Sequence, residues 1–227
     1  MLYDNKKQYK YFFTKPYTMR LLTTLLRFVQ YTSVKNGIDE SHALGHAMDV
    51  LHYTHQNYIN QRTKCPQLIE QEAIFYSAAI LHDMYDHKYE NKNIPPLSSV
   101  LQFHLKPHEI TVVKNIVDTM SYSKIKKDGF PDLQQYQWAY HIVREADLLS
   151  SYDMDRAMIY HMFHSKADAP SSYDNIQALF ESRVQNYYKD NLFMTEYAKS
   201  KGHELQEKSI EQLSNWKSII QSYDRYI

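Results

Sequence analysis

Glycine occurs only four times in this chain of 227 residues, and this scarcity limits the possible folds more than any other feature of the sequence. The tight turns of a β sandwich and the glycine-rich loops that cradle phosphate rely on backbone conformations that glycine adopts freely, whereas long helices need almost none. No segment shows a convincing alternation of apolar and polar residues, which is the pattern of a half-buried strand. The sequence therefore predicts an all-α protein.

The few turn and breaker residues divide the chain into helix-sized pieces. Their pattern predicts helices over about 42–60, 67–85, 98–104, 107–120, 133–149, 155–164, 173–189 and 195–223, with a polar turn through 124–131. Asp39 and Ser41 are expected to cap the first of these helices, and Pro66 opens the second. The second helix is apolar nearly all round, so we expect it to be central and buried.

The length of the chain favours one domain with one substantial core. We expect a compact single-domain helical bundle. In it, residues 1 to about 35 form an N-terminal helical extension, residues 40–165 form the core that carries the motifs, and residues 173–227 form closing helices. No internal repeat, low-complexity tract or linker marks a second domain.

The charge balance and the cysteine content bound the partners and the compartment. Lys+Arg and Asp+Glu are equal at 26 each, so no overall field favours a long nucleic acid or an anionic membrane surface. The one cysteine, Cys65, excludes an internal disulfide and fits a reducing compartment. No stretch has the length of a signal peptide or a membrane span, so we expect a cytoplasmic protein, with a homodimer left open.

Two polar residues, His82 and Asp83, end the most apolar predicted helix. Helical spacing turns both side chains towards the core, where a carboxylate without a partner costs several kcal/mol. Something positive must therefore meet Asp83. For an isolated His-Asp pair, a salt bridge or a hydrogen-bonded histidine is the simpler explanation.

Two further predicted helices repeat this anomaly. His46 lies between Ala43 and Val50 on a face that flanks the apolar stripe of its helix, and Asp147 lies beside apolar positions of another. Three helices thus each direct a metal-capable group inward. Imidazole and carboxylate ligands suit a divalent cation, so one shared ion explains all of these residues together.

The order of these residues, His, then His-Asp, then Asp, resembles the HD superfamily of metal-dependent phosphohydrolases. The segments 82–89, 116–123 and 145–149, and the tail from Met194, resemble successive blocks of the small bacterial-type HD hydrolases. The resemblance implies a compact helical bundle of the HD-domain type that holds one divalent ion (Mn²⁺, Mg²⁺, Ni²⁺, Co²⁺, Fe²⁺ or Zn²⁺). The ligands it implies are His46, His82, Asp83 and Asp147. It also implies hydrolysis of a small phosphorylated metabolite, such as a nucleotide or its pyrophosphate linkage.

A mechanism follows from the charge of such an ion, which polarises a phosphoryl oxygen and lowers the pKa of water. Asp83 and Asp86 share a face if the helix continues, and we assign Asp86 to orienting or deprotonating the attacking water. Lys88 and Arg144 are candidates for neutralising the phosphate of the substrate. His42 is a further candidate, as a group that supports the ligands or touches substrate.

Two other functions stay open at this point. An HD-fold diiron oxygenase would need additional ligands, such as His104 or His108, and a non-catalytic binding or regulatory module would keep the metal only for stability. The basic run at Lys124, Lys126 and Lys127 is expected to be a solvated loop and not a nucleic-acid site.

Overall fold

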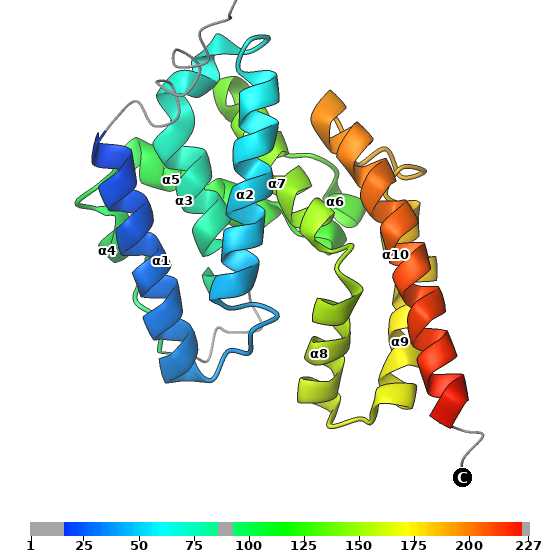
Figure 1. Ribbon diagram of the computed structural model, residues 1–227. Coiled ribbons are helices and arrows are strands. Elements are labelled where there is room, and N and C mark those ends of the chain that lie inside the picture. Colours follow the sequence, from blue (N-terminus) through cyan, green and yellow to red (C-terminus); the bar gives the residue numbers. More distant parts are fainter. Residues whose placement is uncertain (1–15, 86–92, 224–227) are drawn as a thin grey trace, which may run out of the picture.

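The computed structural model describes residues 16–85 and 93–223, and within these ranges every regular element is a helix (Figure 1). The prediction of an all-α protein is therefore confirmed. None of the helices in these ranges is both long enough and apolar enough to cross a membrane.

The elements follow one another in a chain of helices joined by short connections. The α-helices are α1 (Pro16–Asn36), α2 (Leu44–Gln61), α3 (Glu72–Leu81), α4 (Leu97–Leu101), α5 (Pro107–Thr119), α6 (Tyr122–Asp128), α7 (Gln137–Ser150), α8 (Met154–Ser165), α9 (Ala169–Ser182) and α10 (Glu196–Tyr223). Short 3-10 helices are η2 (Pro66–Gln71), η3 (His82–Tyr85), η5 (Gln134–Tyr136) and η6 (Val184–Asn186).

Among the described residues there are two apolar cores, and the first lies among α1 to α5 and the first part of α7 (Figure 1). Every residue of α3 from Ile74 to Leu81 is buried, because a helix that is apolar all round can leave no face in water. α1 packs against this core through Leu21, Leu25 and Val29, which lie one turn apart on one face. α3 is therefore the central element that the sequence predicts.

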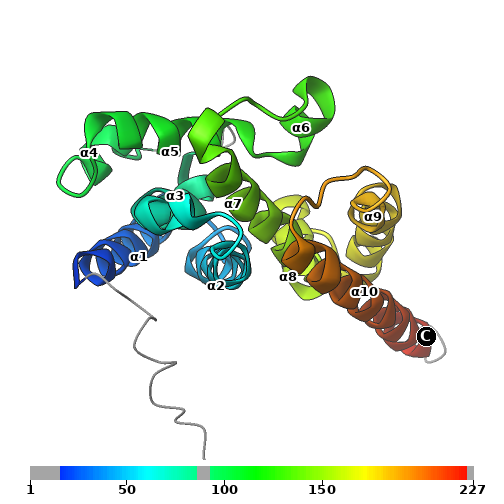
Figure 2. The ribbon, with the colours of Figure 1, turned by 90° about the horizontal axis from the view of Figure 1, so that it is seen from above.

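The second core lies among α6, the end of α7, and α8 to α10. In α8 the buried residues are Met154 and Met158, and in α9 they include Ile176 and Phe180, so each helix buries one stripe. Figures 1 and 2 both show α8, α9 and α10 grouped on one side of α2 and α7.

α7 belongs to both cores. Its residues Ile142 and Ala146 are part of the first core, whereas Leu148 and Leu149 are part of the second. Figure 2 shows α7 running between the group of α1 to α3 and the group of α8 to α10. The carboxyl end of α7 therefore lies at the junction of the two cores.

Three local expectations are wrong. The helix expected over 67–85 is divided into η2, α3 and η3, and the segment expected as a polar turn forms α6, which ends where Gly129 adopts a φ of 77°. α2 begins after Ala43 with no side-chain cap. Asp39 instead accepts a hydrogen bond from the Ser41 backbone N–H at 3.0 Å.

Candidate metal centre

The four residues expected as metal ligands lie on three helical elements that meet at the junction of the cores. His46 is in the first turn of α2, and Asp147 is in the last turn of α7. His82 and Asp83 open η3, directly after the buried α3. Because α3 is apolar on every side, its end carries these two polar side chains into the interior.

The ligand atoms of the four side chains converge. The Nε2 atoms of His46 and His82 are 3.0 Å apart. His46 Nε2 lies 3.2 Å from Asp83 Oδ2 and 3.5 Å from Asp147 Oδ1. His82 Nε2 lies 3.5 Å from Asp83 Oδ1 and 3.6 Å from Asp147 Oδ1.

These separations fit one common cation. Bonds of about 2.0–2.2 Å from nitrogen and oxygen to a divalent metal place neighbouring ligand atoms about 3.0 Å apart in an octahedral site and about 3.4 Å apart in a tetrahedral one. The measured His–His and His–Asp separations fall around this range. His46, His82 and Asp83 lie close enough together to hold an ion as a group of three, and Asp147, which is not part of this group, approaches it beside the two histidines. The residues present therefore fit a divalent metal.

Protons alone satisfy this cluster poorly. His82 Nδ1 lies 2.9 Å from the carbonyl oxygen of Ala79, which can only accept, so Nδ1 carries a proton and Nε2 faces the cluster. One proton on His46 Nε2 could serve only one of its three neighbours. Asp83 Oδ2 is buried and makes no hydrogen bond to the described residues. A divalent cation would serve all of these groups at once.

Both carboxylates are held in the ionised form. Burial alone would raise the pKa of Asp147, but the hydrogen bond to His46 and the charge of His82 lower it to about 2. Burial likewise opposes ionisation of Asp83, yet His82 and His46 hold its pKa well below the usual value. At His46, burial and the charge of Arg156 lower the pKa, and the contacts with Asp147 and Asp83 outweigh them and raise it. Two ionised carboxylates therefore face the imidazoles, and this set of donors suits a divalent cation.

The centre opens into a cavity of about 320 Å³. The two histidine side chains are only 2% and 5% exposed, whereas those of Asp83 and Asp147 are 15% and 28% exposed, so the carboxylates face the cavity. A bound ion could thus meet both the buried ligands and a molecule in the cavity. His46, Asp83 and Asp147 line this cavity, and the further residues that line it include Ser41, His42, Tyr122, Ser151, Arg156, Tyr160, Phe180, Arg183 and Tyr187.

Arg144, expected to neutralise phosphate, does not reach this cavity. Its side chain is fully buried in α7, where Nη2 lies 3.2 Å from Glu145 Oε1 and the guanidinium carbon lies 4.7 Å from the centroid of the Phe130 ring. Glu145 also accepts hydrogen bonds from the backbone N–H of Met194 and the hydroxyl of Thr195. The Arg144–Glu145 pair therefore fastens α7 to the start of α10, and the expectation of a substrate contact is corrected.

One of the arginines that line the cavity is Arg156, which the sequence did not single out. It lies in the first turn of α8, whose N-cap is Asp153. The Asp-Met-Asp-Arg segment carried one usable signal, since an N-cap aspartate places the residue three positions later in the first helical turn. Arg156 Nη1 donates a hydrogen bond to the carbonyl of Ser41 at 2.8 Å.

His42 lies on the same wall of the cavity, and the loop before α2 holds it in place. Its Nδ1 lies 2.7 Å from Ser41 Oγ, and this hydroxyl donates to Asp39 Oδ1. Asp39 also meets His164 Nε2 of α8 at 3.1 Å. Ser41 Oγ can therefore accept a hydrogen bond from the Nδ1–H group of His42, which fixes the imidazole orientation. The expectation that His42 supports the site or touches substrate agrees with this position.

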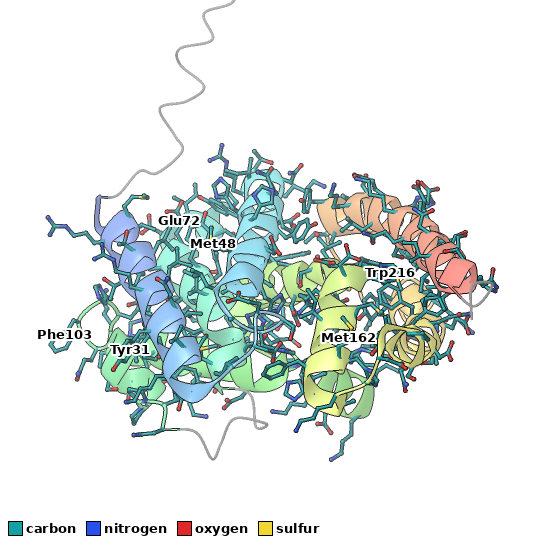
Figure 3. The ribbon with its side chains drawn as sticks, turned by 60° about the horizontal axis from the view of Figure 1, so that its bottom comes forward. Tyr31, Met48, Glu72, Phe103, Met162 and Trp216 are labelled. Atoms are coloured by element: carbon teal, nitrogen blue, oxygen red, sulfur yellow. The ribbon has the colours of Figure 1, made fainter. Side chains whose placement is uncertain are left out.

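The remaining expected residues lie elsewhere. Asp86 and Lys88 fall outside the described residues. His104 lines a different cavity with Glu70 and Phe103, and His108 is exposed at the start of α5. Figure 3 places Phe103 at the edge of the molecule away from Met162, which marks α8. Neither histidine therefore joins the candidate centre in this structure.

Comparisons of the chain with known protein families, with curated proteins and with solved structures find no match. Membership of the HD superfamily therefore stays a prediction from the motifs.

Proposed function

We propose that this protein is a metal-dependent phosphohydrolase of the HD type that acts on a small phosphorylated metabolite, such as a nucleotide or its pyrophosphate linkage. The observation that carries the proposal is the approach of Asp83 and Asp147 to the Nε2 atoms of His46 and His82, at 3.2–3.6 Å, beside a cavity that Arg156 also lines. The carboxylates of Asp83 and Asp147 suit a cation, and Arg156, which forms no ion pair among the described residues, suits an anion beside it.

In the proposed reaction, a bound divalent ion supplies Lewis acidity towards a phosphoryl oxygen and lowers the pKa of water. Arg156 binds a phosphoryl oxygen and neutralises charge that develops in the transition state. His42, which is held by Ser41, orients the part of the substrate that lies against the same wall of the cavity. Asp83 contributes as a ligand, and Asp86 keeps the proposed role of orienting or deprotonating the attacking water.

A substrate screen tests this proposal. Nucleotides and general phosphatase substrates are offered to the purified chain with Mn²⁺, Mg²⁺, Ni²⁺ or Co²⁺, and the metal content is measured on the same samples. We expect hydrolysis in the wild type and its loss in Asp147→Ala, because a missing carboxylate ligand weakens metal binding. Asp174→Ala is the matched control, because Asp174 is exposed on α9 and does not line the cavity.

The alternatives give different results in the same experiment. Two irons per chain would favour the diiron oxygenase. Bound metal with no hydrolysis of any substrate would favour a binding or regulatory module, and hydrolysis that survives in Asp147→Ala would contradict the proposed centre.

A further inference from the structure

Two arginines line the cavity beside the candidate ligands, and neither forms an ion pair with a carboxylate among the described residues. They are Arg156 of α8 and Arg183, which follows α9. The Nε atom of each is buried and has no hydrogen-bond partner in the same part of the chain. Both side chains are half-buried, and a partly desolvated guanidinium without an ion-pair partner carries a cost, so this pair points to an anion supplied by a ligand.

Neutral groups hold both guanidinium groups in place. Arg156 donates to the carbonyl oxygens of Ser41, at 2.8 Å, and Ser150, at 3.5 Å. The guanidinium carbon of Arg183 lies 4.3 Å from the centroid of the Tyr122 ring. Carbonyl dipoles and an aromatic face orient an arginine and leave its charge uncancelled. Burial raises the pKa of Asp49 and the charge of Arg156 acts against this, but the two side chains form no ion pair, so both positive charges remain available to the cavity.

Tyr187 links Arg183 to the metal centre. Its hydroxyl lies 2.9 Å from Ser151 Oγ, and Ser151 follows Asp147 by one turn, with its N–H 3.1 Å from the Asp147 carbonyl oxygen. Burial raises the pKa of the Tyr187 hydroxyl, and the charges of Arg183 and Asp147 also act on this pKa, Arg183 lowering it and Asp147 raising it. The Tyr187 hydroxyl thus lies between Arg183 and the carboxyl end of α7, which carries the candidate ligand Asp147.

We infer that Arg156 and Arg183 select a phosphate monoester dianion over a phosphate diester. The inference rests on the proposed function, because Asp83 and Asp147 would balance a divalent ion and leave the two guanidinium charges to be met by substrate. A monoester dianion balances both charges. A diester is a monoanion, so it leaves one of the two half-buried positive charges without a partner.

Calorimetry on the full chain loaded with Mn²⁺ tests the inference. Because the proposed enzyme would hydrolyse a monoester during the titration, the probes are phosphonates: phenylphosphonate, a dianion that stands for a monoester, and its monomethyl ester, a monoanion that stands for a diester, at pH 8. We expect phenylphosphonate to bind at least about tenfold more tightly than its methyl ester. Arg156→Gln and Arg183→Gln should each weaken phenylphosphonate binding by about tenfold or more and narrow that preference, with Mn²⁺ affinity unchanged.

Control variants separate a binding role from a structural one. Arg27→Gln changes an exposed arginine of α1 outside the cavity and should alter neither probe. Arg183→Lys keeps the charge and loses the flat group over Tyr122, so it should fall between wild type and Arg183→Gln. Equal binding of the two probes by the wild type, or an unchanged preference in both Gln variants, would overturn the inference.

The metal titration on its own tests the proposed function. If Mn²⁺ binds and the two probes bind equally, only the inference fails. If Mn²⁺ does not bind, the proposed function fails. The change in phenylphosphonate binding in the two Gln variants still tests the arginine pair.

Discussion

At the scale of single residues, His141 is a buried base whose surroundings oppose its protonation. Burial and the charge of Arg144 lower the pKa of His141 to about 3. The side-chain amide of Gln137 lies 3.1 Å from His141 Nε2, and Arg144 Nη2 lies 3.4 Å from Nδ1. The folded protein therefore keeps this imidazole neutral well below the pH at which an unfolded chain would protonate it.

We predict that His141 makes the fold sensitive to mild acid. Between about pH 6.5 and pH 3 the unfolded state binds a proton that the folded state excludes, so the free energy of unfolding falls as the pH falls through this window. From pH 7 to pH 5 the loss from this residue is about 2 kcal/mol. Urea denaturation at both pH values should show a fall smaller by about that amount in His141→Gln. His203→Gln, at an exposed position of α10, serves as control, and equal falls in wild type and His141→Gln would refute the prediction.

The sequence was informative about residues whose type conflicts with their surroundings. His82 and Asp83 could be singled out because a polar pair ends an apolar helix, and this conflict is local. Arg144 and Arg156 could not be told apart in the same way. Whether an arginine lines a cavity or pairs with Glu145 depends on where α8 turns back against α2, which no short segment encodes.

At the scale of elements, α10 packs closely against the segment before it. A Cβ atom at Gly202 would lie 2.8 Å from Cε2 of the buried Phe193 ring. At Gly45, in the first turn of α2, the nearest atom would be Glu40 Oε2 at 3.8 Å, which is ordinary contact. Two helical glycines thus stand in opposite steric situations.

We predict that alanine has opposite effects at these two positions. Gly202→Ala should lower the free energy of unfolding by about 1–3 kcal/mol, because the Phe193 ring must move. Gly45→Ala should raise it by up to about 1 kcal/mol, because alanine favours the helix and meets no obstacle. Chemical denaturation of both variants measures the two shifts, and a shift of the same sign at both positions would contradict the close packing of α10.

The existence of most helices could be predicted, whereas their ends could not. The apolar spacing of α2, α5, α8 and α10 encodes the helices directly, since one stripe must be buried. The lysine-rich sequence of α6 did not indicate a helix, because only Ile125 in it is buried and so short a helix shows no apolar stripe. The division of the segment around α3 into α and 3-10 parts reflects packing against α1, α5 and α7, which lies beyond local propensity.

At the scale of the whole molecule, the candidate centre ties α2, α3 and α7 together. An ion that binds only the folded chain stabilises it by mass action. We predict that Mn²⁺ at about a hundredfold over its Kd adds about 2.7 kcal/mol to the free energy of unfolding. For a chain of this size, that corresponds to a Tm rise of roughly 5–10 °C.

Thermal melts with added Mn²⁺ and with a chelator measure this shift. Asp147→Asn should abolish it, and Asp174→Asn, at an exposed position of α9, should keep it. A Tm that does not respond to any divalent ion in the wild type would show that the four side chains do not form a metal centre.

Because α7 contributes residues to both cores, the two cores are coupled when the molecule unfolds. His46 and His82 lie on helices of the first core, and Arg156 and Arg183 lie on elements of the second, so the two walls of the cavity belong to different packing units. A cation and an anion held between them would join the units through bonds that neither unit makes alone. Resistance of the short α7–α8 connection to protease cleavage should therefore record occupancy of the cavity even where no product is formed.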